Sequence, residues 1–125
     1  MKVRHWVEFP YMRLRNSLNS RANWRRTWRE GKQQKTAAFM SVRFQTLPPV
    51  YAALVACKRW KVTITRRGPQ EMDDDNLAGV CKWFRDGVAK ALGVDDKSKR
   101  YRWKYEQEKT TKAQGYSVLL EIEGF

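Results

Sequence analysis

The sequence has few of the residues that would place the protein in a secreted, zinc-thiolate or membrane class. Its two cysteines, Cys57 and Cys81, form no CxxC pair, and we interpret both as small buried hydrophobic residues. The longest apolar run, residues 50–57, is well short of the roughly 18 to 20 residues that a helix needs to span a bilayer. The amino-terminal segment also lacks the apolar block of a signal peptide. We therefore expect a cytoplasmic protein without membrane association.

Acidic residues are nearly absent from the first half of the chain. Residues 1–69 hold 16 lysines and arginines and two acids, a net charge of +14. Residues 70–125 hold 10 basic and 11 acidic residues, a net charge of −1. Such a bias is typical of proteins that bind the phosphates of nucleic acid. A membrane surface is the competing partner, but it favours a helix with a clean apolar face, and here the aromatic residues are scattered along the whole chain.

The pattern of apolar residues predicts a mixed α/β (α+β) fold, a single domain over residues 1–125 with a mixed β-sheet and two main helices. The length and apolar content are sufficient for one core. Alternating apolar and polar residues predict four strands, at residues 5–9, 59–65, 101–106 and 116–123. Helical spacing predicts one helix at residues 21–45 and a second that begins within residues 72–77 and ends at residue 92. We expect the last two strands to pair as an antiparallel hairpin.

Aspartates gather at the two ends of the second predicted helix. Asp73, Asp74 and Asp75 stand at its start, where carboxylates commonly cap helices. Asp95 and Asp96 follow its glycine stop, where solvated turn aspartates are common. A second interpretation is a shared site, because Asp73 and Asp75 would point the same way from an extended segment. The strand after Asp96 could then run back along the same edge of the sheet.

A shared carboxylate site would need a cation. Neighbouring carboxylates repel by about 4 kcal/mol per pair at roughly 4 Å for an effective dielectric near 20. In a chain with one histidine, oxygen ligands favour a hard dication such as Mg²⁺, which polarises a phosphate and activates a water. Lys82 follows Asp75 by seven residues, about two helical turns, and so lies on the same helix face. On spacing alone, an ion pair with Asp86 is an equally good interpretation of Lys82.

The segment 72–96, MDDDNLAGVCKWFRDGVAKALGVDD, resembles the signature of RusA-type Holliday-junction resolvases. The shared features are an Asp-x-Asp-Asn-Leu box, a helix with a lysine and an Asp-Gly pair, and a final Asp-Asp pair. The segment SLNSRANW at residues 17–24 is also similar to phage-borne members. The resemblance implies a mixed α/β homodimer, a crossover junction endodeoxyribonuclease that uses Mg²⁺, or Mn²⁺ in its place, to make paired nicks in four-way or branched DNA.

The same resemblance assigns roles to four residues of the segment. It implies that Asp73, Asp75 and Asp96 are catalytic metal ligands and that Lys82 is the catalytic lysine. Asp74 is then a spectator, and the sequence leaves open whether Asp95 shares the metal site. The alternative is a non-catalytic basic nucleic-acid-binding or regulatory protein on the same fold. The set of mutually repelling carboxylates favours the enzyme over this alternative, because a module that does not cut has no need of it.

Basic residues with aromatic neighbours are the expected contacts to DNA phosphates. They would position the duplex arms without reading sequence, and their alternative is a solvated basic surface. The residues are Arg21, Arg25, Arg26, Arg29, Arg66 and Arg67. We expect four tryptophans to lie in the core or an interface and not to stack on bases: Trp24, Trp28, Trp60 and Trp103. The single histidine, His5, is interpreted as structural.

Overall fold

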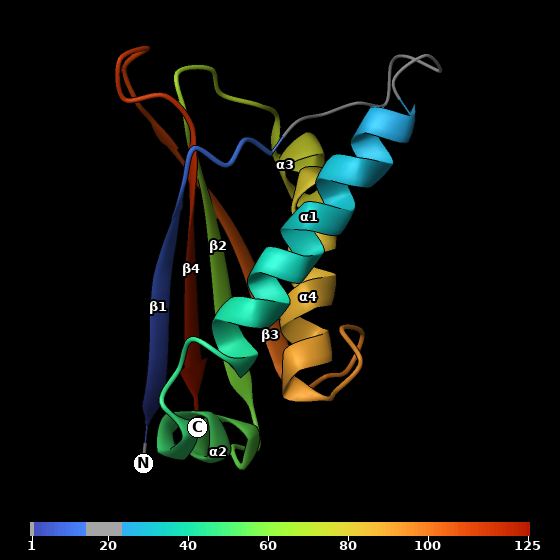
Figure 1. The fold of residues 1–125 in the computed structure, drawn as a ribbon, viewed down its shortest axis with the longest axis vertical. Coiled ribbons are helices and arrows are strands. Elements are labelled where there is room, and N and C mark those ends of the chain that lie inside the picture. Colours follow the sequence, from blue (N-terminus) through green and yellow to red (C-terminus); the bar gives the residue numbers. More distant parts are fainter. Residues whose placement is uncertain (1, 15–23) are drawn as a thin grey trace.

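The computed structural model describes residues 2–14 and 24–125, which form one domain with a four-stranded sheet and four helices. The strands are β1 (Val3–Pro10), β2 (Trp60–Gly68), β3 (Tyr101–Lys109) and β4 (Ser117–Gly124). The helices are α1 (Trp24–Arg43), α2 (Pro48–Val55), α3 (Asp74–Val80) and α4 (Lys82–Leu92). Helices α1 and α4 lie side by side over the sheet, and α2 closes the end near both termini (Figure 1). The mixed α/β fold predicted from the sequence is confirmed.

The pairing of the strands corrects one prediction. The sheet has the order β1-β4-β2-β3, in which β4 is antiparallel to both of its neighbours and β2 is parallel to β3. The expected hairpin between the last two strands is therefore wrong. Strand β4 is the more apolar of the two and is buried along most of its length, which suits a central strand. Strand β3 is charged on every second residue and forms an edge.

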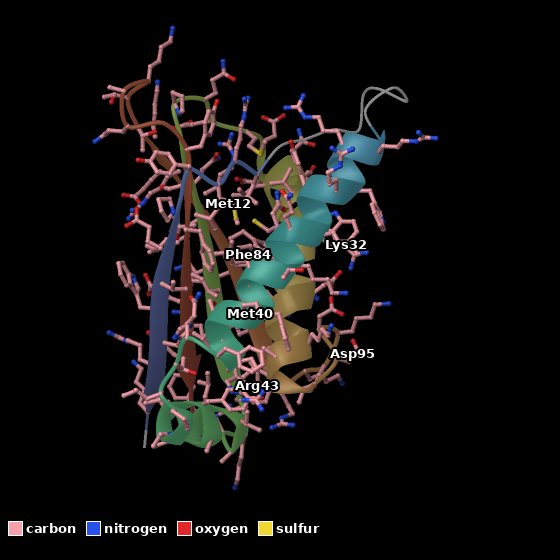
Figure 2. All side chains as sticks on the ribbon, in the orientation of Figure 1. Met12, Lys32, Met40, Arg43, Phe84 and Asp95 are labelled. Carbon is pink, nitrogen blue, oxygen red and sulfur yellow. The ribbon has the colours of Figure 1, made fainter. Side chains whose placement is uncertain are left out.

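The core lies between the sheet and helices α1 and α4. Residues that alternate along β2 and β4 point into it, including the fully buried Ile64, Leu120 and Ile122. Phe84 enters from α4 (Figure 2). Its ring meets that of Phe9 edge-on, with centroids 4.9 Å apart. The apolar residues that alternate along the strands therefore pack against the apolar stripe of α4 and form one core layer.

Two features of the helices differ from the sequence prediction. Helix α1 ends at Arg43, and Pro48 and Pro49 begin an unpredicted helix, α2, since a proline at the first positions of a helix loses no hydrogen bond. The second predicted helix, which was expected to begin within residues 72–77 and end at residue 92, is divided into two helices, α3 and α4, which meet at Cys81. The end of α4 is as expected, because Gly93 adopts the left-handed conformation with φ of 73°.

The burial of His5 predicts that the stability of the fold depends on pH. Its side chain is 9% exposed in β1, and burial lowers its pKa below the ordinary value of 6.5. As the pH falls, the unfolded chain binds a proton first, so stability is complete above about pH 6.5 and decreases below it. One proton limits the slope to about 1.4 kcal/mol per pH unit. We expect urea unfolding to show this loss between pH 7.5 and 5.5.

A His5→Leu variant should have a flat profile over the same range, because the chain has no other histidine. The comparison is made within each protein across pH, so a general loss of stability in the variant does not affect it. A variant that keeps the wild-type slope would assign the pH dependence to other groups.

Candidate active site

The inner face of β3 holds the turn that carries Asp96. The hydroxyl of Tyr101 donates a hydrogen bond of 2.8 Å to the carbonyl of Val94. Two residues along the strand, the indole Nε1 of Trp103 donates one of 2.9 Å to the carbonyl of Asp96. Side chains two apart on a strand share a face, so this turn is attached to β3 at two successive points.

The same face of β3 also holds the chain just before α3. Gln107 forms two hydrogen bonds with the backbone of Met72: Nε2 donates to the carbonyl at 2.7 Å, and Oε1 accepts from the amide at 3.0 Å. Asp73 follows Met72 directly. Trp103 and Gln107 are four residues apart, about 13 Å along a strand. One strand thus fixes both carboxylate-bearing segments relative to each other.

The carboxylate of Asp96 lies between two cations of α4. Its Oδ2 is 3.0 Å from Arg85 Nε and 4.0 Å from Lys82 Nζ. The Arg85 Nε contact is an ion pair without the alignment of a hydrogen bond. Instead, the two terminal nitrogens of Arg85 donate to the carbonyl of Asp96 and the hydroxyl of Tyr105, each at 2.9 Å. The guanidinium also lies 4.8 Å from the ring centroid of Trp103.

Lys82 satisfies both interpretations of its position. Its Nζ is 3.7 Å from Asp86 Oδ1, the i+4 ion pair expected from the spacing, and 4.0 Å from Asp96 Oδ2. Its side chain is 63% exposed, so the ammonium can reach a ligand in solvent. The structure therefore brings together Lys82 and Asp96, two of the four residues assigned by the resemblance.

Asp73, Asp74 and Asp75 are exposed at the start of α3. Asp73 is the extended N-cap residue, but Asp74 and Asp75 already belong to the helix. The interpretation that Asp73 and Asp75 point the same way from one extended segment is therefore wrong, because successive helical residues are about 100° apart. The other interpretation, a helix that starts at these aspartates, is confirmed. The side chain of Asp73 makes no cap hydrogen bond.

The carboxylates do not form a preassembled metal centre within residues 2–14 and 24–125. In that range no three acidic, histidine or cysteine side chains are grouped closely enough to hold a metal ion. Asp95 stabilises the turn after α4: its Oδ1 accepts a hydrogen bond of 2.8 Å from the Lys97 amide, and this bond lowers the pKa of Asp95. The metal-ligand roles of Asp73, Asp75 and Asp96 stay predictions.

The structure removes Arg66 from the expected phosphate contacts. Its side chain is 4% exposed, and its guanidinium donates to the carbonyls of Leu14 at 3.1 Å and Gln70 at 2.7 Å. Burial lowers the pKa of Arg66, because desolvation disfavours the charged form. Arg66 therefore connects β2 to two loops by hydrogen bonds and does not present its charge at the surface.

The other predicted phosphate contacts differ in how far their charge is already paired. Arg67 is 3.3 Å from Glu8 and 2.7 Å from Glu108, and Arg26 is 3.1 Å from Glu30. Arg25 and Arg29 are exposed on α1. Arg21 lies outside the described residues. Among the predicted contacts, those on α1 are thus better placed at the surface than those on β2.

The tryptophans divide between core and surface. Trp60 is buried as expected, and Trp103 is half-buried beside Arg85. Trp28 is 50% exposed on α1, so of the two expected locations, core or interface, the core is excluded. The side chain of Trp24 lies outside the described residues.

Sequence reasoning missed Arg85, Tyr105 and Gln107, the residues that position the Asp96 turn and Met72. One signal was available, since Tyr105 and Gln107 fall on the same alternating face of β3 as Trp103. Arg85 gave no signal beyond its place one turn after Lys82. No sequence pattern reveals that a guanidinium will hold a carbonyl eleven residues further along the chain.

Comparisons with known proteins add no family assignment: no protein-family model and no curated protein matches the chain. The resemblance to RusA-type resolvases therefore stays a prediction. Among the described helices, none combines the length and the apolar character needed to cross a membrane.

Proposed function

We propose that the protein is a metal-dependent endonuclease that resolves four-way and related branched DNA by paired nicks. The observation that carries the proposal is the frame provided by β3. Gln107 holds the residue before Asp73, and Trp103 holds Asp96, so two acidic segments far apart in the sequence share one rigid strand. A net charge of +13 supports a polyanionic substrate.

The donor set suits a hard cation that also binds the substrate. Mg²⁺ is commonly held by one or two carboxylates together with substrate phosphates, so a protein cage of three ligands is not required beforehand. Asp73 and Asp75 would supply carboxylate oxygens at the start of α3, and Asp96 would join them as the third ligand. When bound, Mg²⁺ or Mn²⁺ would polarise the phosphate and activate a water.

The residues around Asp96 would support the chemistry in two ways. Lys82 is exposed beside Asp96, so its ammonium can stabilise the negative charge that develops on the scissile phosphate. Arg85 holds the Asp96 backbone through a 2.9 Å hydrogen bond and keeps the turn in place. Arg85 is accordingly a positioning residue, whereas Lys82 would touch the substrate.

The alternative is a non-catalytic nucleic-acid-binding protein on the same fold, and one observation favours it. The Asp96 carboxylate is already within 4.0 Å of both Lys82 and Arg85. A carboxylate paired in this way has a structural role without any metal. Under this alternative, the basic surface of α1 binds DNA and Asp96 only fixes the loop after α4.

A homodimer is part of the proposal. A four-way junction presents two strands of like polarity, and one domain carries one set of the assigned aspartates. A two-fold dimer would place one site on each of these strands.

Incubation with an end-labelled four-way junction tests the proposal. We expect symmetric nicks with Mg²⁺ or Mn²⁺ and none with EDTA, and little cutting of linear duplex of the same sequence. A protein that binds the junction but does not cut it with either ion would contradict the nuclease and support the binding module.

A further inference from the structure

The first half of α1 exposes an aromatic ring among cations. Trp28 is 50% exposed, and Lys32, one helical turn later, has its Nζ 4.5 Å from the centroid of the indole ring. An open cavity of about 400 Å³ lies here, lined by Trp28, Arg29, Lys32, Gln33, Thr36 and Ala37. Lys32 projects from this part of the helix in Figure 2.

The charge around the ring has one sign. Helix α1 carries six lysines and arginines and a single acid, Glu30. Glu30 lies 3.1 Å from Arg26, and it is absent from the cavity lining, whose only charged residues are Arg29 and Lys32. The surface therefore offers a half-exposed indole ring with the Lys32 ammonium over one of its faces and no acidic residue in the cavity lining.

The surface formed by Trp28, Arg29 and Lys32, here called the cationic patch, lies on the helix that packs against α4, which carries Lys82. A Cβ added to Gly31 would collide with the indole ring of Trp83, so α1 packs closely on α4 at this level. Trp83 is the residue next to Lys82. A ligand on Trp28 is therefore separated from the candidate site by the contact between two helices, and α3 lies at the same end of the molecule as the start of α1 (Figure 1).

We propose that Trp28 is a stacking platform for an unpaired nucleobase, with Arg29 and Lys32 holding the adjoining phosphates. Every base has a π-face, so a tryptophan binds single-stranded DNA without reading its sequence, and lysine or arginine beside it holds the backbone. In an uninterrupted duplex the bases are stacked on one another and cannot occupy the ring. The inference rests on the DNA-binding part of the proposed function and adds a preference for junctions, forks or flaps with unpaired bases.

The test measures binding without cleavage, by fluorescence anisotropy in EDTA. The probes are a labelled oligothymidine and an abasic oligonucleotide of the same length and charge. Trp28→Ala should bind oligothymidine about ten- to a hundredfold more weakly, the range that loss of one stacked base predicts, and the abasic strand as before. Trp28→Phe should recover much of the affinity, because the aromatic face is retained.

The chain offers a matched control. Trp6 is 55% exposed, like Trp28, but stands on β1 in register with Glu121 and away from the cationic patch of α1. Trp6→Ala should leave binding to both probes unchanged. Circular dichroism of all three variants shows whether they keep the fold.

Three outcomes would overturn the inference. They are unchanged oligothymidine binding by Trp28→Ala, an equal loss on the abasic strand, and full displacement of oligothymidine by a poly-glutamate peptide at matched charge, which would indicate an acidic protein partner. Because this binding assay contains no metal, its result does not depend on cleavage. A junction that is bound but not cut in the separate assay with Mg²⁺ or Mn²⁺ refutes the nuclease and leaves the Trp28 result intact.

Discussion

Asp73→Asn, Asp75→Asn and Asp96→Asn proteins should each cut four-way junctions at least about a thousandfold more slowly than the wild type. Each change removes a carboxylate that the proposal assigns to the cation, whose stabilisation of the transition state amounts to several kcal/mol. Junction binding should be kept or strengthened, because each change also removes a negative charge that repels phosphates. Single-turnover cleavage at saturating protein and Mg²⁺ measures the chemical step alone.

Two neighbouring carboxylates provide controls for these variants. Asp74 shares the first turn of α3 with Asp75, and Asp86 contacts Lys82 at 3.7 Å without an assigned role in the cation site. Asp74→Asn and Asp86→Asn should retain activity within a few fold. Asp96→Asn also weakens the ion pair with Arg85, so its thermal unfolding is measured beside its activity. A cleavage-competent Asp75→Asn protein would refute the metal-site assignment.

The sequence predicted the elements of the fold better than their arrangement. Alternation in β2 and β4 identified strands because each buries one face, and Gly93 ended α4 where its left-handed conformation required. Alternation says nothing about which strands are neighbours, so the central position of β4 escaped prediction. That position depends on contacts of β4 with two strands distant in sequence.

The sequence indicated which residues belong to the candidate site but not how they are arranged in space. Lys82 and Asp96 were both assigned, and their side chains lie 4.0 Å apart. The sequence did not reveal that Asp75 is helical, since a carboxylate at a helix start suits either an N-cap or a first-turn position. The sequence also predicted phosphate contacts for both Arg66 and Arg67. It could not show that Arg66 is buried, because that burial depends on the loops that fold over β2.

Gly87→Ala should destabilise the protein by about 2 kcal/mol or more, whereas Gly79→Ala should stabilise it by up to about 1 kcal/mol. Gly79 lies in α3 and Gly87 in α4, and in an exposed helix either alanine would gain about 1 kcal/mol. The structure separates them by what surrounds each position. A Cβ at Gly79 has nothing within 4 Å, but one at Gly87 would collide with the backbone carbonyl oxygen of Lys35 in α1.

The collision at Gly87 is costly because a backbone atom cannot move away as a flexible side chain can. Helix α1 would have to shift from α4, and the overpacking penalty of about 1 to 3 kcal/mol or more exceeds the gain in helix propensity. Urea unfolding of the two variants beside the wild type measures both changes. Because α1 carries Trp28 and α4 carries Lys82, a shifted helix pair should also weaken binding of oligothymidine to Gly87→Ala but not to Gly79→Ala. Equal stabilities of the two variants would contradict the close approach of α1 and α4 on which the placement of the cationic patch depends.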